Sequence, residues 1–190
     1  MYRDYCTQCR YPINTCVCHA IEPVHITTNV YIFQHPKEKR HAKSTVRLLH
    51  LLSANIKVIN AKDKESVDLL LSQLNTEDTA IIYPNPNSVA LDIKSNSTVE
   101  NDIKNLLVID GSWSQAYSIF NQNQNFNKFK SYHFDSPPKQ KFIIRKAKRA
   151  EQLSTLEAVA YSLKNIEGLD ERPFLFLFDE MQKHWLNHIK

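Results

Sequence analysis

The chain has 190 residues, 42% of them hydrophobic, which is enough for the core of one domain with a small appendage. No stretch approaches the ~20 apolar residues of a membrane helix, and the first residues lack the apolar core of a secretory signal, so we expect a cytoplasmic protein with no membrane segment. The formal charge of +4 is modest.

The positive charge is concentrated in one segment. Residues 128–149 contain eight lysines and arginines but only one acidic residue, Asp135, whereas the rest of the chain is net acidic. A local basic segment on a near-neutral body suggests a phosphate-bearing partner, although a solvated lysine-rich face would show the same pattern.

All four cysteines lie at the amino end. They are spaced as Cys6-x2-Cys9-x6-Cys16-x-Cys18. In a chain expected in the cytoplasm, this clustering favours a metal over disulfides, and four thiolates suit tetrahedral zinc. The last pair is tight, so His19 could replace one thiolate, and reactive or redox thiols are the alternatives. Because four protein ligands leave no open position, we expect structural zinc in a module covering residues 1–24.

The rest of the chain alternates between strand and helix patterns. Its first half predicts strands within residues 24–33, 56–59 and 79–83, and helices over 46–52 and 66–74. Its second half predicts a short helix near 89–91, a strand over 106–109, a helix from 112 to about 120, a loop over 121–125, a strand over 142–145, a basic loop over 146–152, and helices over 154–168 and 174–185. This alternation implies a mainly parallel sheet flanked by helices, an α/β domain over residues 25–190.

The stretch from Val108 to Ala116 reads as a strand, a turn and a helix start. Asp110-Gly111 ends an apolar strand, because glycine permits backbone angles that other residues avoid. Ser112 followed by Gln115 is the pattern of a helix-capping box. Asp110 is therefore expected at the carboxyl edge of the sheet, where open α/β sheets hold ligands.

Three predicted loops share this edge: Tyr83 to Asn87, Asp110 to Trp113, and Arg145 to Glu157. They suggest one composite pocket. The chain has only two glycines and no Gly-x-Gly-x-x-Gly or P-loop pattern, which disfavours a dinucleotide or P-loop site. Purely structural interpretations are also open, with Asp110 shaping a turn, Trp113 packing in the core and Ser154 to Glu157 capping a helix.

Several landmarks resemble the DTW-domain family, which includes bacterial tRNA-uridine aminocarboxypropyltransferases related to SPOUT enzymes. The landmarks are Asp110-Gly111-Ser112-Trp113, the four-cysteine start, His35-Pro36-x-Glu38 continuing into Ser44-Thr45-x-Arg47-Leu48-Leu49, and Arg145 with Leu153-Ser154-Thr155-x-Glu157-Ala158. They occur in the expected order over nearly the whole chain. Two positions depart from the family pattern, with Ser112 for threonine and Ser44 for asparagine.

The resemblance implies transfer of the 3-amino-3-carboxypropyl group of S-adenosylmethionine to N3 of a tRNA uridine, with release of methylthioadenosine. It also implies a SPOUT-like fold with a carboxyl-terminal knot. An RNA methyltransferase of the SPOUT type and a non-catalytic zinc-containing RNA-binding protein are the alternatives.

Under the resemblance each candidate residue has an expected role. Asp110 is the expected general base, and because an ordinary aspartate is a weak base, burial beside Trp113 is expected to strengthen it. The capped helix ends at Ser112 and Ser154, together with Arg145, are expected to hold the carboxylate of the donor. The expected donor-binding residues are Tyr83, Pro84, Gly111, Ser112, Trp113, Arg145, Leu153, Ser154, Thr155 and Glu157. The expected RNA-binding residues are His35, Glu38, Arg40, Thr45, Arg47, Lys139, Lys141, Lys146, Lys148 and Arg149.

Overall fold

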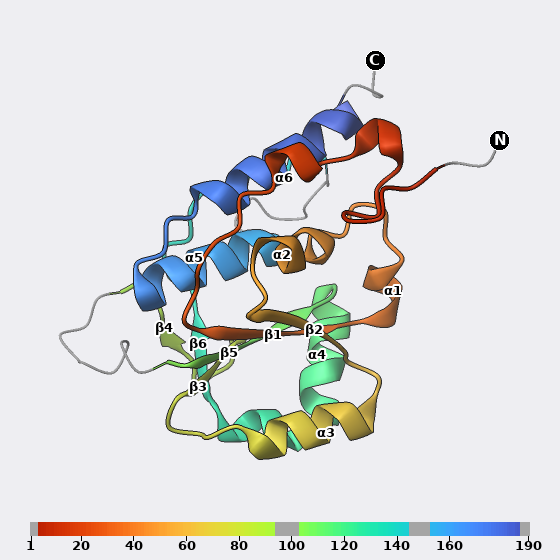
Figure 1. Ribbon diagram of the computed structural model, residues 1–190. Coiled ribbons are helices and arrows are strands. Elements are labelled where there is room, and N and C mark those ends of the chain that lie inside the picture. Colours follow the sequence, from red (N-terminus) through yellow and green to blue (C-terminus); the bar gives the residue numbers. More distant parts are fainter. Residues whose placement is uncertain (1–3, 94–102, 145–152, 187–190) are drawn as a thin grey trace.

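The chain forms a parallel sheet covered by helices on both faces (Figure 1). The computed structural model describes residues 4–93, 103–144 and 153–186. Within these ranges the sheet has six strands in the order β2-β1-β5-β3-β6-β4, and every neighbouring pair is parallel. The predicted fold class, a parallel sheet flanked by helices with an amino-terminal cysteine cluster, is confirmed.

The described elements have the following bounds. The strands are β1 Asn29–Gln34, β2 Ile56–Asn60, β3 Thr79–Ile82, β4 Val89–Ala90, β5 Asn105–Asp110 and β6 Lys130–His133. The α-helices are α1 Pro36–Lys39, α2 Val46–Leu52, α3 Lys64–Gln73, α4 Trp113–Gln122, α5 Thr155–Glu167 and α6 Arg172–Leu186. Short 3-10 helices cover η1 Ile13–Thr15, η2 Cys18–Ala20 and η4 Gln124–Lys128. None of the described helices combines the length and apolar character needed to cross a bilayer.

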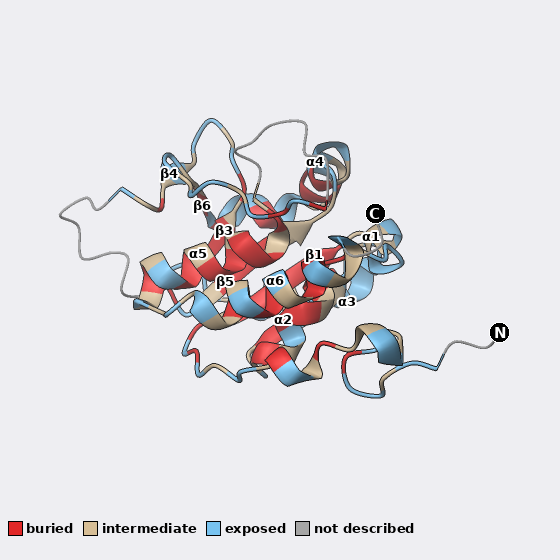
Figure 2. Cartoon of the chain, turned by 90° about the horizontal axis from the view of Figure 1, so that it is seen from above, coloured by how far each residue is buried: buried red, intermediate tan, exposed pale blue. Residues whose placement is uncertain are grey.

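Alternating side chains of β1 divide the core into two layers. Val30 and Ile32 pack in the cluster that contains α2, α5 and α6, whereas Tyr31 and Phe33 pack in the cluster that contains α3, α4 and η4. Because successive side chains of a strand point to opposite faces, a strand between two helical layers needs apolar residues at every position. The buried faces of α2, α5 and α6 are visible from above (Figure 2).

The cysteine segment is part of the larger core. Cys9, Tyr11, Val17 and Ala20 belong to the same buried cluster as α2, α5 and α6. In Figure 1 this red segment lies beside the carboxyl-terminal half of α6. The core therefore continues across residue 24, and the predicted division of the chain into two domains stays a prediction.

Two predicted elements are wrong, and one strand escaped prediction. The expected helix near residues 89–91 is strand β4, and the expected strand over 142–145 is not formed at residues 142–144, while Arg145 lies outside the described residues. There, the backbone N–H groups of Lys141 and Ile143 donate to the side chains of Glu157 and Gln182. Two helix side chains thus replace the partner strand.

Strand β6 and the start of η4 were not predicted, because their sequences are polar. β6 has the sequence Lys-Ser-Tyr-His, in which the aromatic ring of Tyr132 is buried while Lys130 is exposed. The predicted loop over 121–125 instead contains the last turn of α4 and the beginning of η4. Phe126 anchors η4 by packing edge-on against Phe33 at 4.9 Å between ring centroids.

Candidate functional site

Asp110 is the last residue of β5, in the middle of the sheet. Its register partner on β1 is Gln34, also the last residue of its strand. The backbone N–H of His35 donates to the Asp110 carbonyl at 2.9 Å, so the pairing continues to the start of α1. The sequence therefore placed Asp110 correctly, at the carboxyl edge of the sheet.

Side chains from three elements meet at the Asp110 carboxylate. The Gln34 amide donates to Oδ2 at 3.0 Å, and the Thr155 hydroxyl donates to Oδ1. The same Gln34 amide nitrogen also donates to the Ser44 hydroxyl at 3.3 Å. Because Thr155 is the first residue of α5, the positive end of that helix dipole adjoins the carboxylate. These donors fix the orientation of the Asp110 carboxylate.

The start of α5 is held by the predicted capping box. The Ser154 hydroxyl accepts from the Glu157 N–H at 3.3 Å, and the Ser154 N–H donates to Glu157 Oε2 at 2.8 Å. The other carboxylate oxygen of Glu157 accepts from the Lys141 N–H at 2.6 Å. Glu157 is only 5% exposed, so its side chain ties the 141–144 segment to the helix that carries Thr155.

The start of α4 also has the predicted capping box. The predicted reason for a glycine at position 111, its backbone freedom, differs from the one that the structure gives. The Ser112 N–H donates to Gln115 Oε1 at 2.6 Å, and the Ser112 hydroxyl accepts from the Gln115 N–H at 3.4 Å. Gly168 is the glycine with a left-handed backbone, so the expectation of unusual backbone angles at Gly111 is wrong. A Cβ at Gly111 would lie 2.9 Å from Gln115 Cβ, so close packing excludes a side chain.

Two aromatic side chains on α4 face solvent beside the Asp110 turn. Trp113 is 59% exposed and Tyr117 is 65% exposed, and they are four residues apart, on one face of the helix. The interpretation of Trp113 as a core residue is therefore wrong. Exposed aromatic rings at a candidate site are suited to stacking on nucleobases.

The third predicted wall, the Tyr83–Pro84 loop, lies at the same sheet edge. Tyr83 packs in the core layer of α3 and α4, where its ring stacks on Phe120 at 4.0 Å between ring centroids. Burial raises the pKa of the Tyr83 phenol, with a smaller contribution from Tyr117. The following loop is fixed to β6, since Asn85 donates to the Ser131 hydroxyl at 2.8 Å and Ser88 Oγ lies 2.9 Å from His133 Nδ1.

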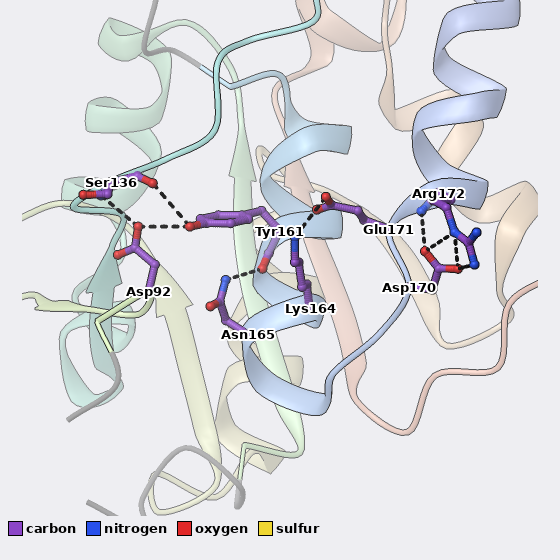
Figure 3. A network of polar contacts seen from close by, with 8 residues as sticks. All are labelled: Asp92, Ser136, Tyr161, Lys164, Asn165, Asp170, Glu171 and Arg172. Atoms are coloured by element: carbon purple, nitrogen blue, oxygen red, sulfur yellow. Dashed lines mark hydrogen bonds and ion pairs between the residues drawn. The ribbon is translucent and has the colours of Figure 1, made fainter. Parts of the chain in front are cut away.

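A polar network on α5 anchors the segment that leaves β6 (Figure 3). Asp92 accepts from the backbone N–H groups of Asp135 and Ser136, both at 2.8 Å, and from the Tyr161 hydroxyl at 3.3 Å. Burial acts to raise the pKa of Asp92, but these N–H donors hold it below its usual value. The network sets the path of the chain toward Glu157.

The predicted RNA-binding residues lie in different environments. The His35 imidazole accepts from the Lys37 N–H at 3.3 Å and caps α1, and Thr45 is only 5% exposed. Lys139 and Lys141 are exposed at the surface. Arg145, Lys146, Lys148 and Arg149 lie outside the described residues.

The four cysteines form one cluster. Their sulfur atoms all lie within 4.8 Å of one another, with Cys6–Cys18 at 3.5 Å and Cys9–Cys16 at 3.6 Å. Disulfide sulfurs would be about 2.0 Å apart, whereas thiolates around a tetrahedral zinc ion lie about 3.8 Å apart. The backbone N–H groups of Cys9 and Gln8 lower the pKa of Cys6 to about 6, whereas burial raises the pKa of Cys18. The cluster can therefore hold a metal ion.

His19 is not part of this cluster. Its Nε2 lies 3.4 Å from Glu180 Oε2 on α6. The alternative in which His19 replaces a thiolate is therefore not supported, because the ring is engaged with the carboxylate of another element.

Sequence reasoning missed Gln34 and Tyr117. Gln34 had a detectable signal, since it is a polar residue ending an apolar strand directly before His35-Pro36, but its contact with Asp110 depends on the strand order. Tyr117 lies one helical turn after Trp113, and only its exposure distinguishes it from a core residue.

Comparison with known proteins gives the family of the chain. The family model for the DTW domain matches residues 3–186. The chain belongs to the DTW-domain family. The positions that carried the resemblance, Asp110 to Trp113 and Leu153 to Ala158, come together in the structure through the contact between Thr155 and Asp110.

Curated relatives match most of this DTW chain. Proteins named tRNA-uridine aminocarboxypropyltransferase 2 from Macaca fascicularis and Mus musculus are each 30% identical to it over 173 residues, which is 87% of this chain and 57% of theirs. A Drosophila melanogaster protein of the same name is 27% identical over 176 residues, covering 89% of this chain and 69% of its own. The DTW chain thus spans little more than half the length of the two mammalian relatives. No solved structure matches it.

Proposed function

We propose that this protein is a tRNA-uridine aminocarboxypropyltransferase that uses S-adenosylmethionine. The observation that carries the proposal is the contact between Thr155 and Asp110, which joins two family landmarks 45 residues apart at the carboxyl edge of the sheet. Relatives with this name across 87% of the chain support the same activity. The exposed aromatic rings beside Asp110 are suited to an RNA substrate.

The proposed reaction is a nucleophilic substitution. Uridine N3 attacks the methylene carbon next to the sulfonium and forms an N–C bond. The C–S bond breaks, its electron pair stays on sulfur, and methylthioadenosine leaves. The N3 proton passes to a base, and the base then releases this proton to solvent. Which sulfonium–carbon bond is aligned with N3 decides whether the aminocarboxypropyl group or a methyl group is transferred.

We assign Asp110 to orient the uracil and accept its N3 proton. The donors Gln34 and Thr155 hold the carboxylate in one orientation. Asp110 can therefore position the uracil as well as accept its proton. The ionised carboxylate also stabilises the positive sulfonium of the donor.

The remaining predicted contacts fit the same scheme. The N-termini of α4 and α5, beside Ser112 and Ser154, are suited to the donor's carboxylate, and Arg145 is proposed to pair with it. Glu157 is proposed to act indirectly, because both its oxygens hold backbone N–H groups. A SPOUT-like knot, a cytoplasmic location and zinc as the ion of the cysteine cluster are further parts of the proposal.

Asp110→Asn separates catalysis from binding. The amide cannot take the proton or balance the sulfonium charge, so we expect turnover of tRNA to fall by roughly 10²–10⁴-fold while tRNA still binds. The measurement is release of methylthioadenosine under single-turnover conditions, with tRNA affinity measured in parallel. Unchanged turnover in Asp110→Asn would contradict the assignment. Absence of turnover in the wild-type protein would favour the non-catalytic RNA-binding alternative.

A further inference from the structure

A cleft lies where the cysteine segment meets the rest of the molecule. It has a volume of about 930 Å³ and lies between residues 4–15, the chain joining α1 to α2, and the end of α6. In Figure 1 these three parts converge near the carboxyl-terminal end of α6. The residues that line the cleft lie far apart in the sequence, so no single sequence motif predicts it.

The cleft is rich in positive charge. Arg10, Arg40 and Arg47 line it, and Asp4 is the one acidic residue among its lining residues. Within the part of the chain that the structure describes, none of the three arginines forms an ion pair. Arginines from two segments far apart in the sequence, without carboxylate partners, form a site for an anion with several charges.

Aromatic rings lie among these charges. The Arg47 guanidinium lies 4.8 Å from the ring centroid of Tyr11, which is 5% exposed. The Tyr11 hydroxyl is buried and has no hydrogen-bond partner among the described residues, so a polar group is missing there. Tyr5 is 58% exposed, and Trp185 on α6 completes the wall. Cationic side chains beside aromatic rings bind single-stranded nucleic acid, whose phosphates pair with arginine and whose bases stack on the rings.

The cleft and the Asp110 site share one segment. Ser44 accepts from Gln34, which also donates to Asp110, while Arg40, Ala42 and Arg47 line the cleft. The intervening Lys43 donates to the Ile144 carbonyl at 2.7 Å and lies 5.1 Å from the centroid of the Trp185 ring. Residues 40–47 therefore contribute to both the cleft and the Asp110 site.

The cysteine cluster positions the wall of the cleft that residues 4–15 form. Arg10 and Tyr11 directly follow Cys9, and the turn that carries them is closed by two bonds, Arg10 N–H to the Cys6 carbonyl at 3.0 Å and Cys6 N–H to the Tyr11 carbonyl at 2.8 Å. Arg10 has a left-handed backbone with φ of 58°. A metal ion on the cysteines would fix this turn and thus the direction of Arg10.

From this arrangement we infer that the cleft binds an unpaired stretch of the RNA substrate. Arg10, Arg40 and Arg47 hold its phosphates, and Tyr5 stacks on one of its bases. The inference rests on the proposed function for the identity of the RNA, and it adds a binding site remote from the transfer chemistry. It also gives the cysteine cluster a role in RNA affinity.

The test compares two double variants that remove equal charge. Arg10→Ala/Arg40→Ala removes two exposed arginines of the cleft. Lys164→Ala/Arg172→Ala is the control, because Lys164 lies on α5 and Arg172 begins α6 (Figure 3), about 14 Å along the helix axis from Met181, the first α6 residue that lines the cleft. The measurement is the Kd of an unmodified tRNA transcript at several salt concentrations.

We expect the cleft variant to bind tRNA at least 10-fold more weakly, with the slope of log K against log salt reduced by about 2, and the control to stay near the wild type. Affinity for S-adenosylmethionine, measured by calorimetry, should be unchanged in both. Equal tRNA affinities and slopes in the two double variants would overturn the inference.

Tyr5 tests the base contact separately. Tyr5→Ala should weaken binding of a short oligouridylate roughly 5- to 100-fold, whereas Tyr5→Phe should retain it, because stacking needs the ring and not the hydroxyl. If oligouridylate and polyglutamate of equal charge bind the cleft equally, the site recognises charge alone and the RNA assignment is rejected.

The two proposals fail in different ways. If arginine-dependent tRNA binding is found but no group is transferred, the cleft stands and the proposed activity fails. If the group is transferred and the cleft variant has wild-type affinity, the activity stands and the cleft inference fails.

Discussion

The Asp110 carboxylate lies at the carboxyl edge of the sheet, and its neighbours hold it in a fixed orientation. Gln34 and Thr155 both donate to it, from β1 and from the start of α5. Under the proposed function, this fixed orientation helps to align the uridine nucleophile with one carbon of the sulfonium donor.

Thr155 should matter through its hydroxyl. Thr155→Val keeps the branched shape but removes the donor to Asp110, and a hydrogen bond to a charged group is worth about 1.5–3 kcal/mol. We expect kcat to fall by roughly 10- to 100-fold with little change in folding stability. Thr155→Ser, which retains the hydroxyl, should stay within a few-fold of the wild type. Wild-type kcat in Thr155→Val would show that the contact has no role in turnover.

Gly111 should be intolerant of even one methyl group. In Gly111→Ala the new Cβ would lie 2.9 Å from Gln115 Cβ, so the first turn of α4 must shift and its capping box weakens. Loss of such a cap costs about 1 kcal/mol. Urea unfolding of Gly111→Ala and Ser112→Ala should show comparable destabilisation. Stability of Gly111→Ala equal to the wild type would contradict the close-packing explanation.

At the scale of elements, side chains of α5 and α6 organise an irregular segment. Glu157 and Gln182 take the backbone groups of residues 141–143, and Asp92 takes those of residues 135 and 136. Side chains of α5, of α6 and of Asp92, which follows β4, thus bind the backbone between β6 and α5. These bonds hold residues 141–143 beside α5, whose first residue, Thr155, contacts Asp110.

The Asp92 network predicts a defined loss of stability in acid. Its N–H donors hold the pKa of Asp92 below the ordinary value of 3.8, so its ionised form stabilises the folded chain. This contribution is fully present well above pH 3.8, and it is lost as the pH falls through the lower pKa of the folded state. The free energies of unfolding of the wild type and Asp92→Asn, measured from pH 7 to pH 3, should therefore converge in acid.

Asp179→Asn is the matched control, since Asp179 is exposed on α6. Its difference from the wild type should show no such convergence. A constant difference between the wild type and Asp92→Asn down to pH 3 would contradict the stabilising role of the Asp92 carboxylate.

The regular elements were accessible from sequence where pattern and capping agreed. Apolar runs predicted β1, β2, β3 and β5, and Ser112 and Ser154 predicted the starts of α4 and α5. Strand β6 was not predictable, because its polar residues become a strand only by pairing with β3 and β4. The strand predicted at Phe142 failed for the converse reason, since distant side chains of Glu157 and Gln182 satisfy its backbone.

The candidate site was predictable in part for the same reasons. Asp110 and Thr155 were found from motifs, while Gln34 and the arginine-lined cleft depend on which strands and helices become neighbours in space. Trp113 shows that residue type alone does not reveal exposure, because an aromatic residue at a helix start can belong to the core or to a binding surface.

At the scale of the whole molecule, the cysteine segment is joined to the main core. Cys9 is fully buried, and Tyr11, Val17 and Ala20 pack in the cluster of α2, α5 and α6. A metal ion held by the four thiolates would therefore stabilise more than its own loop. It would also fix one wall of the arginine-lined cleft.

Metal removal should lower both stability and RNA affinity. We expect one zinc ion per chain by elemental analysis and a fall in Tm when a strong chelator removes it, because the four sulfur atoms are spaced as zinc ligands are. Cys9→Ser should reproduce the loss of zinc. A wild-type protein purified with no metal, and with a Tm indifferent to chelators and added zinc, would contradict the metal site.

The most direct test of the central claim follows the atoms of the donor into tRNA. S-adenosylmethionine labelled either in its methyl carbon or in its aminocarboxypropyl carbons is incubated with the protein and tRNA, and the nucleosides are then analysed by mass spectrometry. The proposed activity predicts that label from the aminocarboxypropyl carbons appears on a uridine while methyl label leaves as methylthioadenosine. Methyl label on the nucleoside together with S-adenosylhomocysteine as product would contradict it and identify a methyltransferase.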